Sequence, residues 1–178
     1  MIVFDLETTG LPKAEGSDLD MQPRIIEFGA IKLTDGTFEE IERLEFFCNP
    51  GHPLEPKITK LTGITDDMLA DKDPFTAHYK TLCQFFLGQQ SMAAHNLPFD
   101  RKILKFELER IDKVTNFPWP YDHICTVEIG ESVWGKKRKL GDIHFEVTGK
   151  EIKNAHRSIN DVEATIEIIK WYKSEGHF

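Results

Sequence analysis

The sequence lacks the features that mark membrane-spanning and secreted proteins. No run approaches the roughly 18 consecutive apolar residues that cross a bilayer. The N-terminus has no basic segment followed by an apolar core and a cleavage site. Internal repeats and low-complexity segments are also missing. We therefore expect a cytoplasmic protein without a membrane partner.

Cysteine is scarce, with three residues at Cys48, Cys83 and Cys125. Their number is odd, they lie far apart, and none has the paired spacing that holds zinc or a redox disulfide. We interpret them as reduced thiols in or near the core.

Positive charge is also in short supply, because 22 Lys and Arg against 30 Asp and Glu leave a net charge of −8. Proteins that bind nucleic acid usually carry a basic surface, so only modest nonspecific affinity for a duplex is expected. This argument weakens if carboxylates hold metal, since each divalent cation would cancel the charge of a carboxylate pair. The local exception is the run Lys136–Lys139 beside Trp134. Two interpretations of this run stay open, a solvated surface or a phosphate-binding loop.

Hydrophobic periodicity predicts one globular domain of strands and helices. The 178 residues are 40% hydrophobic, which is enough for one sizeable core. Asp35-Gly36 between two apolar runs predicts a two-residue hairpin turn, and Asp73 and Pro74 are typical of a helix cap and first helical position. Strands that pair first and then alternate with helices indicate a mixed α/β sheet covered by helices. The predicted strands are 1 to about 7, 24–34, 37–48, 91–95 and 121–126; the predicted helices are 74–86, 98–111, 140–147 and 158–172, with helical turns at 58–61 and 65–69 and a mobile loop at 13–22.

The first predicted strand carries two acids, Asp5 and Glu7, directly before a Thr-Thr-Gly turn. Side chains two positions apart on a strand point to the same face. Unpaired charges in a buried site are very costly, and carboxylate oxygens suit a hard divalent cation such as Mg²⁺ or Mn²⁺. The alternative is a strand end that reaches solvent, with both acids hydrated.

Three further candidates follow strands or begin helices. Asp100 and Asp161 fall in first helical turns, where acids also serve as caps, and Asp161 lies three residues after Ser158 as in a capping box. His156 alone is equally compatible with a packed or surface histidine. In open sheets the strand ends and helix starts meet on one rim, where ligands bind. We therefore expect these side chains to join Asp5 and Glu7.

Three ordered motifs carry a family resemblance. They are Phe4–Leu11 (FDLETTGL), Ala94–Asp100 (AHNLPFD) and Ala155–Asp161 (AHRSIND). With them, the chain resembles the DEDDh (DnaQ-like) 3′–5′ exonuclease family of the ribonuclease H-like fold, which includes the proofreading epsilon subunit of bacterial replicative DNA polymerase. Residues 25–33 and 61–65 look like connecting stretches of that family, so the resemblance covers nearly the whole chain. It implies a mixed five-stranded sheet, its first three strands antiparallel, flanked by helices, in a single exonuclease domain over residues 1–178.

The resemblance implies a catalytic set of Asp5, Glu7, Asp100, His156 and Asp161. The four acids would hold two divalent cations, Mg²⁺ or Mn²⁺, with Asp5 bridging both, Glu7 and Asp161 at one and Asp100 at the other. His156 would act as general base, because histidine exchanges its proton near neutral pH. A histidine at this spacing separates the branch from relatives that carry tyrosine there. The products would be nucleoside 5′-monophosphates.

The resemblance also implies a substrate pocket. Thr8, Thr9 and Leu11 would form the site for the terminal nucleotide, while Asn96 and Phe99 would flank the strand. For Phe99 an alternative stays open, since its ring could equally pack the helix that carries it. A base could stack on this ring without sequence preference.

The expected substrate is the 3′ end of single-stranded or frayed nucleic acid, with DNA favoured over RNA. The alternatives are an exoribonuclease of the same family, a catalytically silent nucleic-acid-binding module and an endonuclease of the same broad fold. Two features depart from the family. Ser158 stands where many relatives have alanine, which suits a helix cap. The sequence stops at Phe178 without the polymerase-tethering tail of an epsilon-like subunit, which leaves a polymerase or replication partner open.

Overall fold

A five-stranded mixed sheet forms the centre of the computed structural model, which describes residues 1–177. The strands are β1 (Ile2–Thr8), β2 (Ile25–Leu33), β3 (Glu40–Phe47), β4 (Ser91–Ala94) and β5 (Asp122–Cys125). Their order across the sheet is β3-β2-β1-β4-β5, so β1 lies in the middle. The first three strands are antiparallel, as predicted, whereas β4 runs parallel to β1 and to β5.

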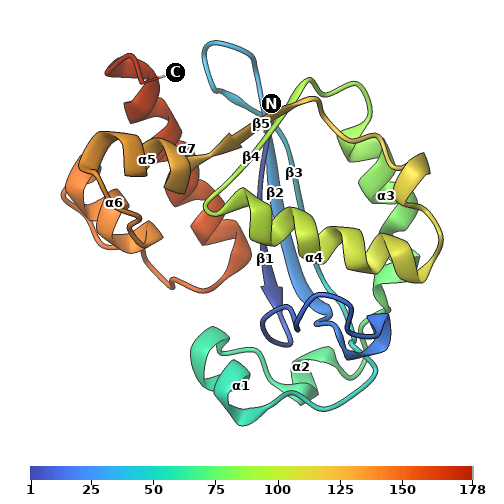
Figure 1. The fold of residues 1–178 in the computed structure, drawn as a ribbon. Coiled ribbons are helices and arrows are strands. Elements are labelled where there is room, and N and C mark those ends of the chain that lie inside the picture. The colour runs from blue at the N-terminus through green and yellow to red at the C-terminus, as the bar shows by residue number, and fades with distance from the viewer. Residues whose placement is uncertain (178) are drawn as a thin grey trace.

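Helices cover both faces of this sheet (Figure 1). Helices α3 and α4 lie on one side, α5, α6 and α7 lie on the other, and α1 and α2 lie beyond the end of β1. The helices are α1 (Pro56–Thr62), α2 (Asp66–Leu69), α3 (Phe75–Phe86), α4 (Leu97–Arg110), α5 (Thr126–Trp134), α6 (Leu140–Thr148) and α7 (Ser158–Ser174), with short 3-10 turns η1 (Leu19–Met21) and η2 (Val114–Asn116).

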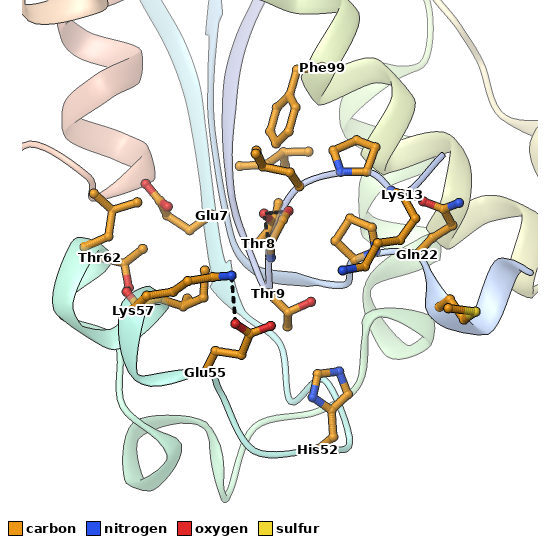
Figure 2. A pocket seen from close by; sticks show the side chains of 18 of the residues that line it. Glu7, Thr8, Thr9, Lys13, Gln22, His52, Glu55, Lys57, Thr62 and Phe99 are labelled. Carbon is orange, nitrogen blue, oxygen red and sulfur yellow. Dashed lines mark hydrogen bonds and ion pairs between the residues drawn. The ribbon is translucent and has the colours of Figure 1, made fainter. Parts of the chain in front are cut away.

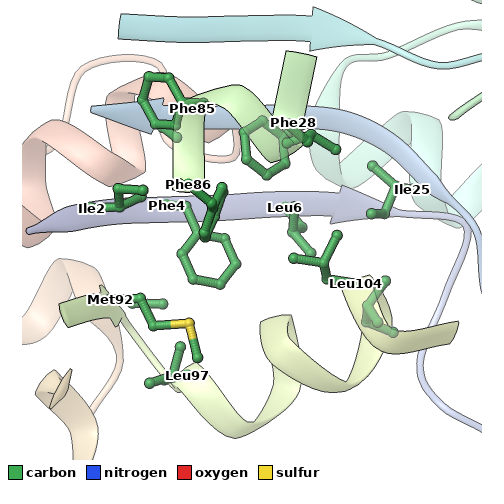
Figure 3. Close-up of a cluster of buried hydrophobic side chains, with 14 of the residues drawn as sticks. Ile2, Phe4, Leu6, Ile25, Phe28, Phe85, Phe86, Met92, Leu97 and Leu104 are labelled. Carbon is green, nitrogen blue, oxygen red and sulfur yellow. The ribbon is translucent and has the colours of Figure 1, made fainter. Parts of the chain in front are cut away.

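The even-numbered side chains of β1 form the larger hydrophobic core under α3 and α4. Phe4 lies at its centre, with its ring centroid 6.2 Å from Phe28 on β2 and 6.0 Å from Phe86 on α3. Ile2 and Leu6 are buried in the same cluster (Figure 3). The rings of Phe4, Phe28 and Phe86 each bury a large apolar area. This burial stabilises the packing of α3 and α4 on this face of the sheet.

The odd-numbered side chains of β1 point to the opposite face, toward α7. Val3 is fully buried there against Val162 and Ile166 of α7. Because side chains alternate along a strand, Asp5 and Glu7 share the face of Val3. The two acids therefore lie on the side of the sheet that α7 covers.

The predicted two-residue turn at Asp35-Gly36 is wrong. Residues 34–39 all lie between β2 and β3, and the Thr34 N–H closes this longer loop by donating to the Glu39 carbonyl at 2.9 Å. Phe38 adopts a left-handed φ of 54° and is only 7% exposed, packed in the core beneath α7. Burying an aromatic ring outweighs the local preference for a tight turn.

The start of α3 differs by one residue from its prediction. Helix α3 begins at Phe75, with Pro74 in extended conformation at the cap position and no side-chain capping bond. The expected cap at Asp73 is therefore wrong. The apolar stripe of this helix is confirmed, since Phe75, Leu82 and Phe86 are buried.

Helix α5 was not expected from the sequence, because Thr, Val and Ile dominate its first half and favour strands. Its central glycine, Gly130, lies against α7, where a Cβ atom would come 2.7 Å from the Tyr172 hydroxyl. That hydroxyl donates to the Thr126 carbonyl at 3.0 Å. Tertiary packing against α7 thus stabilises a helix that local propensity does not support.

The predicted loop at 13–22 contains η1 and is attached to α4. The Arg110 guanidinium donates to the carbonyl oxygens of Leu19 at 2.9 Å, Gln22 at 2.8 Å and Pro23 at 3.3 Å. These bonds hold the loop beside the end of β1, where it forms part of a cavity wall.

The structure also bears on the cysteines and on membrane-spanning helices. The three cysteines are free, with Cys48 and Cys125 buried and Cys83 half-buried, as predicted. Among residues 1–177, no helix has the length and apolarity needed to cross a membrane.

Candidate active site

The two acids of β1 lie opposite a glycine and a third acid on β2. In the antiparallel register, Asp5 faces Gly29 and Glu7 faces Glu27. The register shifts between Glu7 and Thr8, where β1 ends. Directly opposed residues share one face of a sheet. The face toward α7 therefore carries three carboxylates around one glycine.

Gly29 allows α7 to rest directly on the sheet. A Cβ atom at this position would lie 2.6 Å from the Ser158 hydroxyl oxygen and 2.8 Å from the backbone nitrogen of Ile159. Both distances are shorter than real Cβ contacts, and the second involves backbone that cannot turn away. The missing side chain at Gly29 thus brings the first turn of α7 next to Asp5.

Glu27 caps the start of α7 from the neighbouring strand. Its fully buried carboxylate accepts hydrogen bonds from Arg157 Nε at 3.0 Å and Nη2 at 2.9 Å, and from the Ser158 backbone N–H at 3.1 Å. A carboxylate at a helix N-terminus is favoured by the helix dipole and by charge-assisted hydrogen bonds. The predicted side-chain cap at Ser158 is wrong, because Ser158 is the first helical residue and its hydroxyl oxygen has no partner.

The turn before α7 brings His156 and Asp161 together. His156 adopts a left-handed φ of 66°, and its backbone N–H donates to Asp161 Oδ2 at 3.1 Å. The other oxygen, Asp161 Oδ1, is buried without a hydrogen-bond partner. Ligand atoms of Glu7, His156 and Asp161 all lie within 4.8 Å of one another. The structure therefore assembles three of the five predicted residues in one cluster.

Asp100 joins the site from α4, on the other side of β1. The chain leaves β4 through Asn96, which has a left-handed φ of 70°, and enters α4 at once. The Asp100 carboxylate is buried, and the backbone N–H groups of Leu6 and of Asp100 itself act to lower its pKa. This proximity to β1 places Asp100 close enough to Asp5 for their charges to interact.

The ionised forms of the site's four acids, Asp5, Glu7, Asp100 and Asp161, are destabilised by burial and by neighbouring carboxylates. Burial raises the pKa of Asp5 well above its usual value, and the charges of Asp161 and Glu27 raise it further. Burial and then Asp5 raise the pKa of Asp100, and burial raises the pKa of Asp161. Burial, followed by Asp5, Asp161 and Glu27, raises the pKa of Glu7 to about 9. Without a cation, the folded chain thus favours the protonated, uncharged form of these carboxyls.

A hard divalent cation fits these donors. Carboxylate oxygens are the ligands that Mg²⁺ and Mn²⁺ prefer, and a bound cation would favour the ionised carboxylates. The unpartnered Asp161 Oδ1 is a buried acceptor that a cation would satisfy. Among residues 1–177, Glu7, His156 and Asp161 form the group with metal-ligand spacing, and Asp5 and Asp100 lie close enough to interact with its charges.

A cavity of about 770 Å³ opens at the end of β1, and we call it the β1-end cavity. Its wall includes Glu7, Thr8, Thr9, Leu11 and Phe99, together with loop 13–22 and α1. Figure 2 shows Glu7 and Phe99 on its sheet and α4 sides. Of the five residues predicted for the substrate pocket, four line this cavity.

The two threonines at the end of β1 also organise the local backbone. The Thr8 hydroxyl donates to the Gly10 carbonyl at 2.7 Å, and Thr9 Oγ1 accepts the Arg24 backbone N–H at 2.9 Å. Leu11 is 75% exposed at the mouth of the cavity. Phe99 is half-buried and packs on the core while lining the cavity, so both interpretations of its role hold geometrically.

A second cavity of about 820 Å³ lies beside α6, and we call it the α6-side cavity. Asn96, the fifth predicted pocket residue, lines this cavity and not the first. His156 and Asp161 line it too, together with Lys137–Lys139. The carboxylate cluster therefore has one cavity at Glu7 and another at His156 and Asp161.

Three residues of this arrangement escaped the sequence analysis, namely Glu27, Gly29 and Arg157. Glu27 is the one acid in the apolar stretch that forms β2, and Gly29 follows it on the same face. An acid and a glycine two positions apart in a buried strand are a usable signal of close helix packing. Arg157 has no comparable signal, because its partner lies 130 residues away.

Comparison with known proteins agrees with this geometry. The family model RNase_T, described as an exonuclease, matches residues 2–169. A PolC-type DNA polymerase III from Bacillus subtilis is 33% identical over 172 residues, which cover 94% of this chain and 11% of that protein. The chain thus spans about a ninth of the length of this curated relative.

Solved structures share the fold at lower identity. A zinc-bound complex of Escherichia coli ExoI with single-stranded DNA superposes with a TM-score of 0.77 at 23% identity, covering 98% of this chain and 40% of that one. The nuclease domain of 3′hExo, described as a DEDDh family member bound to rAMP, gives 0.78 at 20% identity and covers 98% and 92%.

Proposed function

The chain belongs to the DnaQ-like 3′–5′ exonuclease family, and from this premise we propose that it hydrolyses nucleic acid from the 3′ end to nucleoside 5′-monophosphates. The carrying observation is the cluster of Glu7, His156 and Asp161, whose ligand atoms lie within 4.8 Å of one another. A pure binding module does not need this set. Residues 1–178 act as a single exonuclease domain in this proposal.

The acids of the cluster hold the metal in this proposal. Asp5 would contribute to both metal sites, Glu7 and Asp161 to one of them, and Asp100 to the other. Two divalent cations, Mg²⁺ or Mn²⁺, would activate a water molecule and stabilise the leaving 3′-oxygen. The unpartnered Asp161 Oδ1 and the raised carboxylate pKa values support this assignment.

His156 takes the proton of the attacking water. The ligand atoms of Glu7, Asp161 and the His156 ring lie within 4.8 Å of one another, so a water molecule bound by these acids would be within reach of the imidazole. The side chain is exposed, so the proton can pass on to solvent. Histidine suits this step because it exchanges a proton near neutral pH.

The β1-end cavity receives the terminal nucleotide. Thr8, Thr9 and Leu11 line it at the end of β1, and Phe99 offers a ring on which a base can stack. Asn96 contacts the strand from the α6-side cavity. A cavity of about 770 Å³ is large enough for one nucleotide, which suits a single-stranded or frayed end.

DNA is the preferred substrate in this proposal, and a polymerase or replication protein is the expected partner. Support comes from the PolC-type DNA polymerases, whose similar segment is 33% identical to this chain. An exoribonuclease is the second candidate, because 3′hExo shares the fold and was solved with rAMP.

The proposal is tested with a 5′-labelled single strand of DNA and an RNA of the same sequence. Wild type should shorten the DNA stepwise from the 3′ end in Mg²⁺ or Mn²⁺, and a chelator should stop it. Asp5→Ala should abolish hydrolysis, because it removes the bridging ligand, while circular dichroism remains that of the wild type. Glu131→Gln, an exposed acid on α5, is the control and should keep the wild-type rate.

Two results would contradict the proposal. If Asp5→Ala retained the wild-type rate in Mg²⁺, the proposed metal site would be contradicted. Cleavage of a strand with a blocked 3′ end would indicate an endonuclease. Faster loss of the RNA than of the DNA would favour the exoribonuclease.

A further inference from the structure

The basic run between α5 and α6 opens onto the α6-side cavity. We call residues 136–139 the basic loop. Lys137, Arg138 and Lys139 line the cavity together with His156 and Asp161. The one concentration of positive charge noted in the sequence therefore adjoins the carboxylate cluster.

Arg138 anchors this loop to the fold. Its guanidinium lies 5.0 Å from the ring centroid of Trp134 and donates from Nη2 to the Asp142 carbonyl and to Glu146, both at 3.2 Å. The Arg138 backbone also lies near enough to His95, beside β4, to act on its pKa, which burial lowers to about 4. Arg138 is thus occupied by contacts within the protein, and it holds its two neighbours at the cavity wall.

The neighbouring lysines are not occupied in this way. The side chains of Lys136, Lys137 and Lys139 are exposed, and within residues 1–177 they form no hydrogen bond or ion pair. What distinguishes them is their density, with three exposed lysines within four residues of a chain of net charge −8. Asp142 and Glu151 line the same cavity without pairing to them.

The position of Lys137 and Lys139 relative to the two cavities indicates which part of the substrate they contact. The β1-end cavity adjoins Glu7 and takes the terminal nucleotide in the function proposed above, on which this step rests. The rest of the strand must leave the carboxylates on another side, and the α6-side cavity adjoins His156 and Asp161. Each nucleotide of that strand carries one phosphate.

We propose that Lys137 and Lys139 bind the backbone phosphates of the substrate strand on the 5′ side of the scissile bond, in the α6-side cavity. Because Arg138 already fixes the loop, little conformational entropy is lost on binding. Phosphate contacts of this kind carry no sequence preference. They keep the strand bound while its end is shortened.

The test compares Lys137→Gln/Lys139→Gln with Lys80→Gln/Lys113→Gln, a control pair of exposed lysines on α3 and after α4. A fluorescein-labelled oligothymidylate of ten nucleotides is titrated in chelator from 50 to 200 mM KCl, so that no hydrolysis occurs. Removing two phosphate contacts should reduce the slope of log affinity against log salt by about 1.4. By the same relation the affinity at 0.1 M salt should fall about 25-fold. The control pair should change neither quantity.

Hydrolysis provides the second readout. In Mg²⁺ the double variant should raise KM for the ten-nucleotide strand with kcat little changed, and should degrade a thymidine dinucleotide as the wild type does. An unchanged salt slope, or an equal change in the control pair, would overturn the proposal for the basic loop. Absence of hydrolysis by the wild type would instead overturn the proposed function, while the binding comparison in chelator would still decide the role of the lysines.

Discussion

Replacing Glu7 with glutamine should make the metal-free protein more stable at neutral pH. The carboxyl is 9% exposed and forms no hydrogen bond among residues 1–177. Burial, with Asp5, Asp161 and Glu27, raises its pKa from 4.5 to about 9. Glutamine has nearly the same shape but no charge to desolvate, so the variant removes the ionisation and keeps the packing.

The sign and size follow from proton linkage. As pH rises above 4.5, the unfolded chain releases the Glu7 proton while the folded chain retains it until about pH 9. The folded state then binds more protons than the unfolded state, so stability falls as pH rises. Each pH unit in this interval costs about 1.4 kcal/mol, which gives about 3 kcal/mol between pH 4.5 and 7. Glu7→Gln should recover that amount at pH 7 and nothing at pH 4.

The assay is urea unfolding in chelator at pH 4 and pH 7, with Glu131→Gln as an exposed control that should show no gain. Adding Mg²⁺ should reverse the order, because the cation binds the folded wild type and stabilises it by mass action. A gain that is equal at both pH values would refute the reasoning, since it would arise from packing. No gain at pH 7 would show that the carboxyl is solvated.

Three further predictions concern the residues around α7. His156→Ala should keep the metal affinity and lower the single-turnover rate by about 100-fold or more, and an unchanged rate across pH would count against its role as base. Arg157→Ala should lower the free energy of unfolding by about 3 kcal/mol, because it leaves the buried Glu27 carboxylate without its ion pair; urea unfolding measures this, and a loss below 1 kcal/mol would contradict it. Gly29→Ala should cost about 1–3 kcal/mol by the same assay and reduce exonuclease activity, because the new Cβ displaces the start of α7. Gly141→Ala, where nothing lies within 4 Å of the added Cβ, is the matched control for stability and should leave the free energy of unfolding unchanged.

Much of the site could be predicted from local pattern. The spacing of Asp5 and Glu7 predicted a shared face, and the structure places them on the face that α7 covers. Asp100 and Asp161 were expected in first helical turns, and both lie there. Predictions of this kind succeed because strand alternation and helix starts are properties of a few neighbouring residues.

Apart from the cap of α3, the features that the sequence did not predict involve contacts between distant segments. Glu27 and Arg157 meet across 130 residues, so neither identifies the other in sequence. The turn before β3 depends on where the ring of Phe38 is buried, and α5 depends on the Tyr172 hydroxyl from α7. Tertiary packing overrides local preference at each of these places.

The docking of α7 on β1 and β2 also determines when the site can come into existence. Asp5 and Glu7 belong to β1 and Asp161 to α7, so ribosomal synthesis produces the first two acids well before the third. Contacts between such distant segments are closed late, after local structure has formed. A nascent chain that lacks α7 therefore carries Asp5 and Glu7 but not Asp161. The proposed hydrolytic site would therefore be complete only after α7 has docked on the sheet.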